Sequence, residues 1–277
     1  MSGVLHIVST PVGNLDDITR RALAVLASVD VIAAEDTRHT ARLLEELGIR
    51  QTLVSYHDHN EQERTPQLVE RLQRGEQVAL VSDAGTPLVS DPGYRLVRAC
   101  HRAGIRVVPV PGASALLAAL VVAGLPTDRF VFEGFLPVKG SGRTAALRRV
   151  AESAATSVLY EAPHRILTLL DELGAVLEAG REVVLCRELT KHFETVLPGT
   201  LAEVRDRVAA DSNQQRGEIV LLVAPAPART VDDAELARLA RLLLQELPAS
   251  RVARVLAGWS GRKRNELYNW LEQLDQD

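Results

Sequence analysis

Short, almost wholly apolar segments alternate with segments of helical periodicity along the first 125 residues. The apolar segments are the predicted strands, at Val4–Ser9, Val31–Ala34, Thr52–Tyr56, Val78–Val81 and Arg106–Val110. The predicted helices that follow them are Ile18–Val29, Arg38–Leu47, Pro66–Arg74, Tyr94–Ala103 and Ser114–Ala123. Strands that are apolar on both faces and alternate with helices form parallel sheets covered on both sides. The pattern therefore predicts a parallel α/β domain.

Acidic and hydroxyl side chains mark the starts of the first two predicted helices. Asp16 and Asp17 are predicted to open the first helix, because the helix dipole favours negative charge at its N-terminus. Thr37 is predicted to cap the second helix.

From Phe130 onward the alternation is looser, and neighbouring strands can pair antiparallel, which predicts a second, mixed α/β domain. The predicted strands are Phe130–Phe132, Ser157–Tyr160, Val183–Arg187, Phe193–Leu197 and Ile219–Val223. The predicted helices are Thr144–Ser153, Arg165–Leu177 and Leu201–Ala210, and Gly140–Arg143 is predicted to be flexible. Pro225 and Pro227 indicate a linker to three helices at Asp233–Leu247, Ser250–Gly258 and Arg264–Leu274. We expect domains at residues 1–125, 126–225 and 226–277, because 277 residues are too many for one ordinary domain.

Composition excludes several classes of protein. The net charge of −4 shows that the chain as a whole is not a polycation, so contact with nucleic acid needs a local basic patch. Cys100 and Cys186 lie far apart, which excludes a disulfide framework and a cysteine zinc site. The longest uncharged apolar stretch, Ala115–Leu125, is much shorter than the roughly 20 residues of a membrane-spanning helix. We therefore expect a soluble, cytoplasmic protein with no membrane contact.

The loops after the predicted strands of the first domain carry the polar residues. In parallel sheets, ligands bind outside the carboxyl ends of the strands. Residues 82–93 form a Gly-, Pro- and Asp-rich loop of twelve residues, where two to six are usual. A ligand pocket is expected there, with the shorter loops at 9–14 and 109–114 beside it. The loop at residues 9–14 is also compatible with an ordinary turn. The segment Glu35–Arg38 is compatible either with a substrate contact or with a helix cap.

The run Tyr56–Glu61 contains His, Asp, His and Glu within five residues. A metal site needs its ligands to converge on one point, whereas consecutive residues point apart. We therefore predict a polar loop and no metal. In the second domain, the polar segments 160–165 and 187–191 each follow a predicted strand, and 217–218 precedes one. These segments could form surface ion pairs, or together they could face the loops of the first domain.

Eight ordered motifs carry a resemblance to a known family. They are LHIVSTPVGNLDDIT, AAEDTRHT, VALVSDAGTPLVSDPG, PVPGASA, LPTDRFVFEGFLP, LYEAPHR, LCRELTK and GEIVLLV. The set resembles the bacterial ribosomal RNA small subunit methyltransferase I family, of the tetrapyrrole-methylase (class III) superfamily. This resemblance implies methylation of the ribose 2′-oxygen of cytidine-1402 in the decoding centre of 16S rRNA. It also implies S-adenosylmethionine as cofactor, held in a cleft between the two α/β domains.

The resemblance assigns cofactor-binding residues motif by motif. In the first domain they are Pro11, Val12, Gly13, Asp83, Gly85, Thr86, Pro87, Leu88, Val89, Ala113 and Ser114. In the second domain they are Tyr160, Glu161, Gly217 and Glu218. Thr86 stands where the superfamily has Asp, and Asp83 is the acid expected to substitute for it.

Transfer of a methyl group to a ribose hydroxyl requires good placement and gains from a general base. The candidates for that base are Glu188, Lys191, Glu35 and Asp36, and the sequence does not choose among them. Arg38 and Arg187 are expected to hold phosphate.

The resemblance favours RNA contact for at least one of two clusters of basic residues, although a solvated helix face is the alternative for each. The clusters are Lys139, Arg143, Arg148 and Arg149, and Arg262, Lys263 and Arg264. Trp259 and Trp270 are expected in the core of the helical extension. The implied partners are 16S rRNA, in the small ribosomal subunit, and a second copy of the chain in a homodimer. A tetrapyrrole-like small-molecule methyltransferase and a non-catalytic RNA-binding adaptor are the alternatives.

Overall fold

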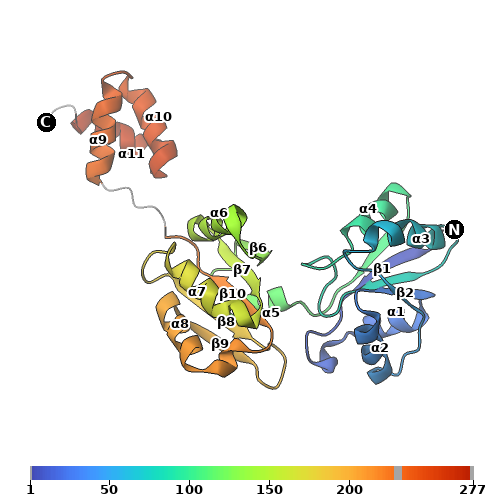
Figure 1. The fold of residues 1–277 in the computed structure, drawn as a ribbon. Helices are drawn as coiled ribbons and strands as arrows, with labels where there is room; N and C mark the ends of the chain where they lie inside the picture. The colour runs from blue at the N-terminus through green and yellow to red at the C-terminus, as the bar shows by residue number, and fades with distance from the viewer. Residues whose placement is uncertain (1, 228–232, 275–277) are drawn as a thin grey trace. The chain divides into compact units, whose positions relative to one another are not determined.

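The structure, a computed structural model, describes residues 2–227 and 233–274. The chain divides into two units, the first ending at Pro225 and the second beginning at Ala226 (Figure 1). The first unit contains two five-stranded sheets, and the second contains helices. The predicted α/β fold class, with a parallel sheet, a mixed sheet and C-terminal helices, is confirmed.

The first sheet is parallel throughout, in the order β3-β2-β4-β1-β5. Its strands are β1 (Val4–Val8), β2 (Val31–Ala34), β3 (Leu53–Ser55), β4 (Val78–Val81) and β5 (Arg106–Val110). Every residue of β2 and β4 is buried, as expected for central strands covered on both faces. The carboxyl ends of all five strands consequently meet at one edge.

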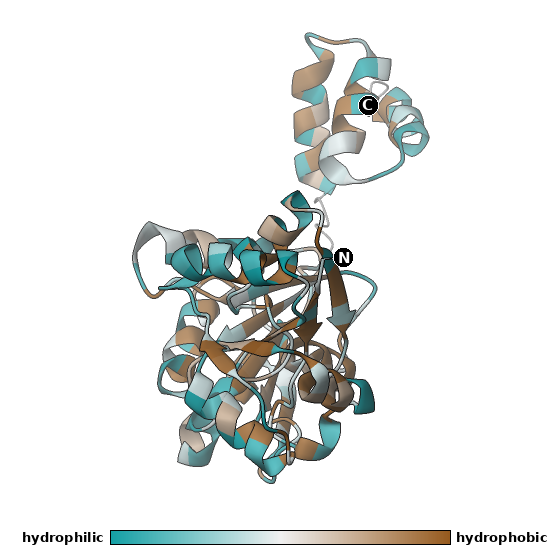
Figure 2. Cartoon of the chain, turned by 90° about the vertical axis from the view of Figure 1, so that its right-hand side faces the viewer, coloured by the Kyte–Doolittle hydropathy of each residue, from teal (hydrophilic) through white to brown (hydrophobic). Residues whose placement is uncertain are grey.

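Alternate strand residues supply two separate cores, because successive side chains point to opposite faces of a sheet. Leu5 and Leu80 pack on one face with α3 (Glu61–Gln73) and α4 (Tyr94–Arg102). Val8 and Val81 pack on the other face with α1 (Arg20–Ser28) and α2 (Thr37–Glu46). Figure 2 shows the apolar strands in brown and the more polar helices around them.

The first helices begin at residues other than those predicted. Asp16 and Asp17 lie in a separate 3-10 helix, Leu15–Asp17, and Thr19 caps α1 by accepting a hydrogen bond from Ala22 N–H. Asp36, not Thr37, caps α2 by accepting from Arg38 N–H. Thr19 and Asp36 can act as caps because their own backbone is extended, just before the helix begins. Sequence periodicity does not reveal that conformation.

The α3 helix starts at Glu61, five residues before the predicted Pro66. Acids in its first turn suit the helix dipole, and Pro66 is accommodated one turn further in. His57 and its neighbours form the turn before this helix. Among the described residues there is no cluster of His, Cys, Asp and Glu that could hold a metal ion.

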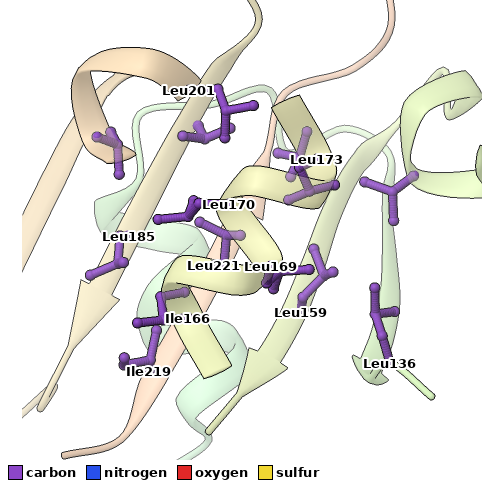
Figure 3. Close-up of a cluster of buried hydrophobic side chains, with 14 of the residues drawn as sticks. Leu136, Leu159, Ile166, Leu169, Leu170, Leu173, Leu185, Leu201, Ile219 and Leu221 are labelled. Atoms are coloured by element: carbon purple, nitrogen blue, oxygen red, sulfur yellow. The ribbon is translucent and has the colours of Figure 1, made fainter. Parts of the chain in front are cut away.

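The second sheet is mixed, in the order β6-β7-β10-β8-β9. Its strands are β6 (Phe130–Phe135), β7 (Thr156–Glu161), β8 (Glu182–Arg187), β9 (Thr195–Thr200) and β10 (Ile219–Val223). Only the β6–β7 pair is parallel. Its core, drawn in Figure 3, lies under α7 (Ile166–Gly174) and α8 (Leu201–Ala210), with α6 (Gly140–Glu152) beside them. The apolar helix α5 (Ala115–Val122) packs on the opposite face.

Three segments of this part differ from expectation. Residues 140–143, predicted to be flexible, form the first turn of α6, because Arg143 is buried in an ion pair with Glu172 of α7. β6 extends past Phe132 through a bulge. β9 begins at Thr195 rather than Phe193. The unit also holds 3-10 helices at Pro163–Arg165 and Ser212–Gln215.

The second unit consists of α9 (Asp233–Leu244), α10 (Ala249–Ser260) and α11 (Arg264–Leu274). Its core includes Leu236, Leu256 and Leu267. Trp259 and Trp270 pack against this core, as predicted. No helix in the described ranges is both long and apolar enough to cross a membrane.

Candidate functional site

A cavity of about 410 Å³ lies at the carboxyl edge of the first sheet, within the range of small-molecule sites. The first sheet's loops contribute Val12, Glu35, Asp83, Ala84, Gly85, Thr86, Val89, Ser90, Asp91, Ser114 and Ala115. The second sheet contributes Phe135, Tyr160, Glu161, Ala162, Pro163, Gly217, Glu218, Ile219 and Val220. The loops of the first sheet lie together because its strands are parallel, so that every loop after a strand leaves from the same edge.

Hydrogen bonds fasten three of these loops to one another. Thr10 N–H donates to Gly85 O at 2.8 Å, and Gly85 N–H donates to Thr10 O at 3.0 Å. Thr86 Oγ1 donates to Ala113 O at 3.0 Å and lies 2.9 Å from Ser9 Oγ. The segments after β1, β4 and β5 therefore form one fixed floor.

The loop after β4 is held in an unusual backbone conformation. Leu88 and Ser90 have φ of 74° and 67°, in the left-handed region that costs non-glycine residues energy. At its end, Gly93 has φ of 136°, and a Cβ there would lie 2.7 Å from Leu80 Cδ2. Such strain persists only where the surroundings fix it, and it clusters at functional sites.

Carboxyl groups gather on the first-sheet side of the cavity. Burial, reinforced by Asp91 and Asp83, raises the pKa of Glu35 from 4.5 to about 7. Burial likewise raises the pKa of Asp91 to about 6, against a hydrogen bond from Ser82. Asp83 Oδ1 accepts from Asp36 N–H at 3.0 Å, which holds the loops after β2 and β4 together.

Tyr160 and Glu161 form the second-sheet wall. The Tyr160 hydroxyl accepts a hydrogen bond from Leu116 N–H at 3.1 Å, and burial raises its pKa to about 12. The rings of Phe135 and Tyr160 pack edge to face, with 5.6 Å between their centroids. Glu161 pairs through Oε1 with Arg165, whereas its buried Oε2 has no hydrogen-bond partner among the described residues. That oxygen is available to a ligand with a donor.

Of the predicted cofactor-binding residues, ten line the cavity. They are Val12, Asp83, Gly85, Thr86, Val89, Ser114, Tyr160, Glu161, Gly217 and Glu218. Pro11, Gly13, Pro87, Leu88 and Ala113 are not among the lining residues and belong to the loops that support them. The lining residues that the resemblance did not assign include Ser90, Asp91 and Phe135, although the length of the loop after β4 was a signal for the first two.

The four candidate bases occupy different environments. Glu35 lines the cavity, and Asp36 is the cap of α2, where the Arg38 guanidinium strongly lowers its pKa. Burial opposes the charge of Glu188, but hydrogen bonds from Glu218 N–H and Lys191 outweigh it and lower its pKa. Burial also opposes the charge of Lys191, but Glu188 and Glu218 outweigh it and raise its pKa.

Glu188 and Lys191 fix the loop between β8 and β9. Lys191 Nζ donates to Glu188 Oε1 at 3.0 Å, and the same oxygen accepts from Glu218 N–H at 2.8 Å. The aliphatic part of Lys191 fills the space where Gly13 would carry a Cβ. This network joins the second sheet to the loop after β1.

Two arginines expected to contact RNA are buried, which corrects that expectation. Arg143 Nε donates to Glu172 Oε2 at 2.8 Å and Nη1 donates to Pro137 O. Arg187 donates to the carbonyls of Arg216 and Phe193. Both guanidiniums complete structural networks with segments distant in sequence, so neither presents its charge to solvent.

The remaining basic candidates are exposed. Lys139 and Arg148 lie on or beside α6, Arg149 pairs with Glu133, and Arg38 pairs with Asp36. In the second unit, Arg262 pairs with Asp233 and Lys263 lies 3.9 Å from Glu266. Arg264 begins α11.

Comparison with known proteins identifies the family. The profile of the Tetrapyrrole (Corrin/Porphyrin) Methylases matches residues 4–205. The Pseudomonas aeruginosa protein named ribosomal RNA small subunit methyltransferase I is 53% identical over 270 residues, 96% of each chain. Its namesake from Escherichia coli O157:H7 is 51% identical over 273 residues, 98% of this chain and 96% of that one. The chain belongs to the ribosomal RNA small subunit methyltransferase I family. The family expected from the eight motifs is confirmed, and so is the prediction that the chain is a methyltransferase.

Solved structures show how widely this family's fold is shared. Diphthine synthase matches with a TM-score of 0.62 at 17% identity, over 80% of this chain and 90% of its own. The methyltransferase CobJ matches with a TM-score of 0.61 at 24% identity, over 83% and 98%. At this identity the match establishes the fold of the methyltransferase unit, and the cavity residues carry the functional argument.

The second unit matches the profile described as the RsmI C-terminal HTH domain, over residues 230–275. In this family member, Gly261 ends α10 in the left-handed conformation, with φ of 72°. A short turn then leads into α11. A short turn that contains glycine is typical of a helix-turn-helix, and here it places Lys263 and Arg264 at the start of the second helix of the pair.

Proposed function

We propose that the chain transfers a methyl group from S-adenosylmethionine to the ribose 2′-oxygen of cytidine-1402 in the decoding centre of 16S rRNA. The observation that carries the proposal is the near-full-length identity of about half to enzymes named for small-subunit rRNA methylation. The cavity of small-molecule size at the carboxyl edge of the first sheet supports the proposal. A reaction on the small ribosomal subunit would take place in the cytoplasm.

The charge of the cavity supports S-adenosylmethionine as the cofactor. Five of the described lining residues are Asp or Glu, and none is Lys, Arg or His. S-adenosylmethionine carries a sulfonium and an ammonium group, so its positive charges suit this lining. The unpartnered Oε2 of Glu161 can accept a hydrogen bond from it, and Val12, Val89 and Ile219 offer apolar contact. When bound, the cofactor supplies an electrophilic methyl group.

We infer that Glu35 is the general base among the four candidates. It lines the cavity, and with a pKa of about 7 it can hold or release a proton near neutral pH. A base of matched pKa contributes typically 10²–10⁴-fold to a rate. Asp36 is engaged in capping α2, and its lowered pKa makes it a weak base.

Glu188 and Lys191 are proposed to act as positioning residues. Their hydrogen bonds hold Glu218, a lining residue, and Lys191 covers Gly13 beside the loop after β1. Good orientation of reactants can supply roughly 7–11 kcal/mol of a barrier, so loops fixed in this way contribute without touching a proton.

We propose that 16S rRNA is held, within the small ribosomal subunit, by the exposed basic residues Arg38, Lys139, Arg148, Arg149, Arg262, Lys263 and Arg264. The positions of Lys263 and Arg264 at the N-terminus of α11 support this, because helix ends and basic side chains contact phosphate. Methylation of a ribose also needs the target nucleotide to leave its stack.

A homodimer is proposed from the surface of α5. This helix is apolar throughout, and it buries Ala119 and Leu120 against the second sheet. Leu117 and Val121, one turn apart, remain 51% and 76% exposed. A helix that is apolar all round is normally covered on all sides. A second copy of the chain is the proposed cover.

The test is transfer of labelled methyl from S-adenosylmethionine to small subunits from a strain lacking this enzyme. Naked 16S rRNA and a tetrapyrrole precursor are assayed in parallel. Label on a ribose 2′-oxygen of the subunit at cytidine-1402 is the expected result. Label on the tetrapyrrole alone would favour a small-molecule methyltransferase, and cofactor-independent RNA binding without transfer would favour an adaptor.

A further inference from the structure

The exposed side of α4 is strongly basic. Leu96 and Cys100 face the core of the first sheet, while Arg95, Arg98 and Arg102 are exposed. No acid occurs anywhere in Tyr94–Arg102. The whole chain has a net charge of −4, so three positive charges on two and a half turns of helix are a local concentration.

Hollows flank this helix on both sides. One lies between α3 and α4 and is lined by Glu61, Gln62, Thr65, Pro66, Tyr94, Arg95, Arg98, Ala99, Arg102 and Ala103. The other is lined by Tyr94, Val97, Arg98, His101 and Arg102. Tyr94, Arg98 and Arg102 belong to both hollows, so α4 forms a ridge that an extended ligand can straddle.

Most of the positive charge on the ridge is available. Arg95 pairs with Glu61, which is the one acid among the described residues of the two linings. Arg98 and Arg102 form no ion pair with another described residue. Arg98 lies 5.9 Å from the centre of the Tyr94 ring, which is itself 63% exposed. A flat aromatic and a guanidinium held together offer both stacking and phosphate contact.

The ridge begins beside the cavity. Asp91 lines the cavity, and α4 begins only three residues later, at Tyr94. At Gly93, between them, the backbone packs so closely that a Cβ would lie 2.7 Å from Leu80 Cδ2 and 2.9 Å from Leu88 Cδ1. From Tyr94 the helix carries its arginines along about 12 Å, at 1.5 Å per residue. A strand whose target nucleotide enters the cavity can therefore continue along α4.

We propose that α4 is a binding surface for the RNA strand that flanks the methylated nucleotide. Arg98 and Arg102 contact its phosphates, and Tyr94 stacks on an unpaired base. This inference rests on the proposed function, since it takes RNA as the substrate. Phosphate contacts of this kind position the strand and carry no sequence information.

The test compares Arg98→Glu/Arg102→Glu with Arg205→Glu/Arg207→Glu, a charge reversal on the exposed side of α8 that also removes the ion pairs of Arg205 with Asp171 and Asp206. Binding to 16S rRNA and to small subunits is measured over a series of salt concentrations, and S-adenosylmethionine affinity is measured separately. We expect the α4 variant to weaken RNA binding at least 10-fold and to reduce the salt slope by about 1.4, the value for two phosphates of a single strand. The affinity for S-adenosylmethionine and the α8 variant's RNA binding should not change.

Unchanged RNA affinity and salt slope in the α4 variant would overturn the inference. Arg98→Gln/Arg102→Gln provides a second test in case charge reversal impairs folding. Tyr94→Ala should weaken binding and Tyr94→Phe should restore it, because phenylalanine keeps the stacking surface. If the wild-type chain binds RNA through α4 but transfers no methyl group, the proposed function fails while the surface stands.

Discussion

Glu35→Gln provides the sharpest test of the acidic edge, because its effect on stability must depend on pH. The pKa of Glu35 rises from 4.5 to about 7 in the folded chain, so the folded state holds this proton more tightly than the unfolded state. Well below pH 4.5 the carboxyl is protonated in both states, so its ionisation does not lower the stability of the fold. As pH rises from 4.5 through 7, ionisation costs more in the folded state than in the unfolded state, and the free energy of unfolding falls. The full shift corresponds to at most ~3.4 kcal/mol. Solvent screening of this half-buried side chain reduces it to about 1–2 kcal/mol.

Glutamine has a similar shape and never ionises. The variant should match the wild type near pH 4.5 and become about 1–2 kcal/mol more stable above pH 8. For a unit of this size the difference corresponds to about 2–8 °C in the melting temperature. Thermal unfolding without cofactor, followed from pH 4.5 to 8.5, measures it. In single-turnover methyl transfer, the wild-type rate should rise with an apparent pKa near 7, and the variant should lose about 10²–10⁴-fold.

Asp36→Asn is the control, because the pKa of Asp36 is shifted in the opposite direction to that of Glu35. The pKa of Asp36 is lowered, so its stabilisation is complete well above pH 4. The variant should be destabilised by an amount that does not change between pH 6 and 8.5. If Glu35→Gln also showed a constant difference over this range, the assignment of a buried, high-pKa carboxyl at Glu35 would be refuted.

Three further changes test other parts of the argument. Thr86→Val removes the hydrogen bond to Ala113 O and should cost about 1–3 kcal/mol and weaken cofactor binding; equal calorimetric affinities in variant and wild type would contradict this. Arg143→Ala leaves Glu172, whose side chain is 35% exposed, without its partner and should destabilise the fold by about 1–3 kcal/mol in denaturant unfolding, while rRNA affinity of the folded fraction stays the same. Val121→Glu should convert a dimer to a monomer in light scattering, and a monomeric wild type would remove the proposed interface.

The sequence predicts most of the first sheet because its signals are local. Apolar runs such as Val78–Val81 are buried strands whatever lies beside them, and the loops after them must leave at one edge. Ten of the fifteen residues assigned to the cofactor by resemblance consequently line one cavity. The role of Asp36 was not predictable, because capping depends on whether the backbone before α2 is extended.

Charged residues show where prediction from sequence ends. Arg143 and Arg148 stand on the same helix, five residues apart, yet one is buried against Glu172 and the other is exposed. Arg187 is buried because the carbonyls of Arg216 and Phe193 reach it from other segments. Whether a charge faces solvent depends on partners contributed by distant parts of the chain.

The sequence by itself determined the alternation of strands and helices, the parallel first sheet and the family, since each follows from short segments read in order. The tertiary structure alone decided that Glu35 and Asp91 share a partly buried edge of the cavity, that Lys191 covers Gly13, and which arginines are buried. Burial and electrostatic coupling act through space between residues far apart in the chain, so only the folded arrangement sets them.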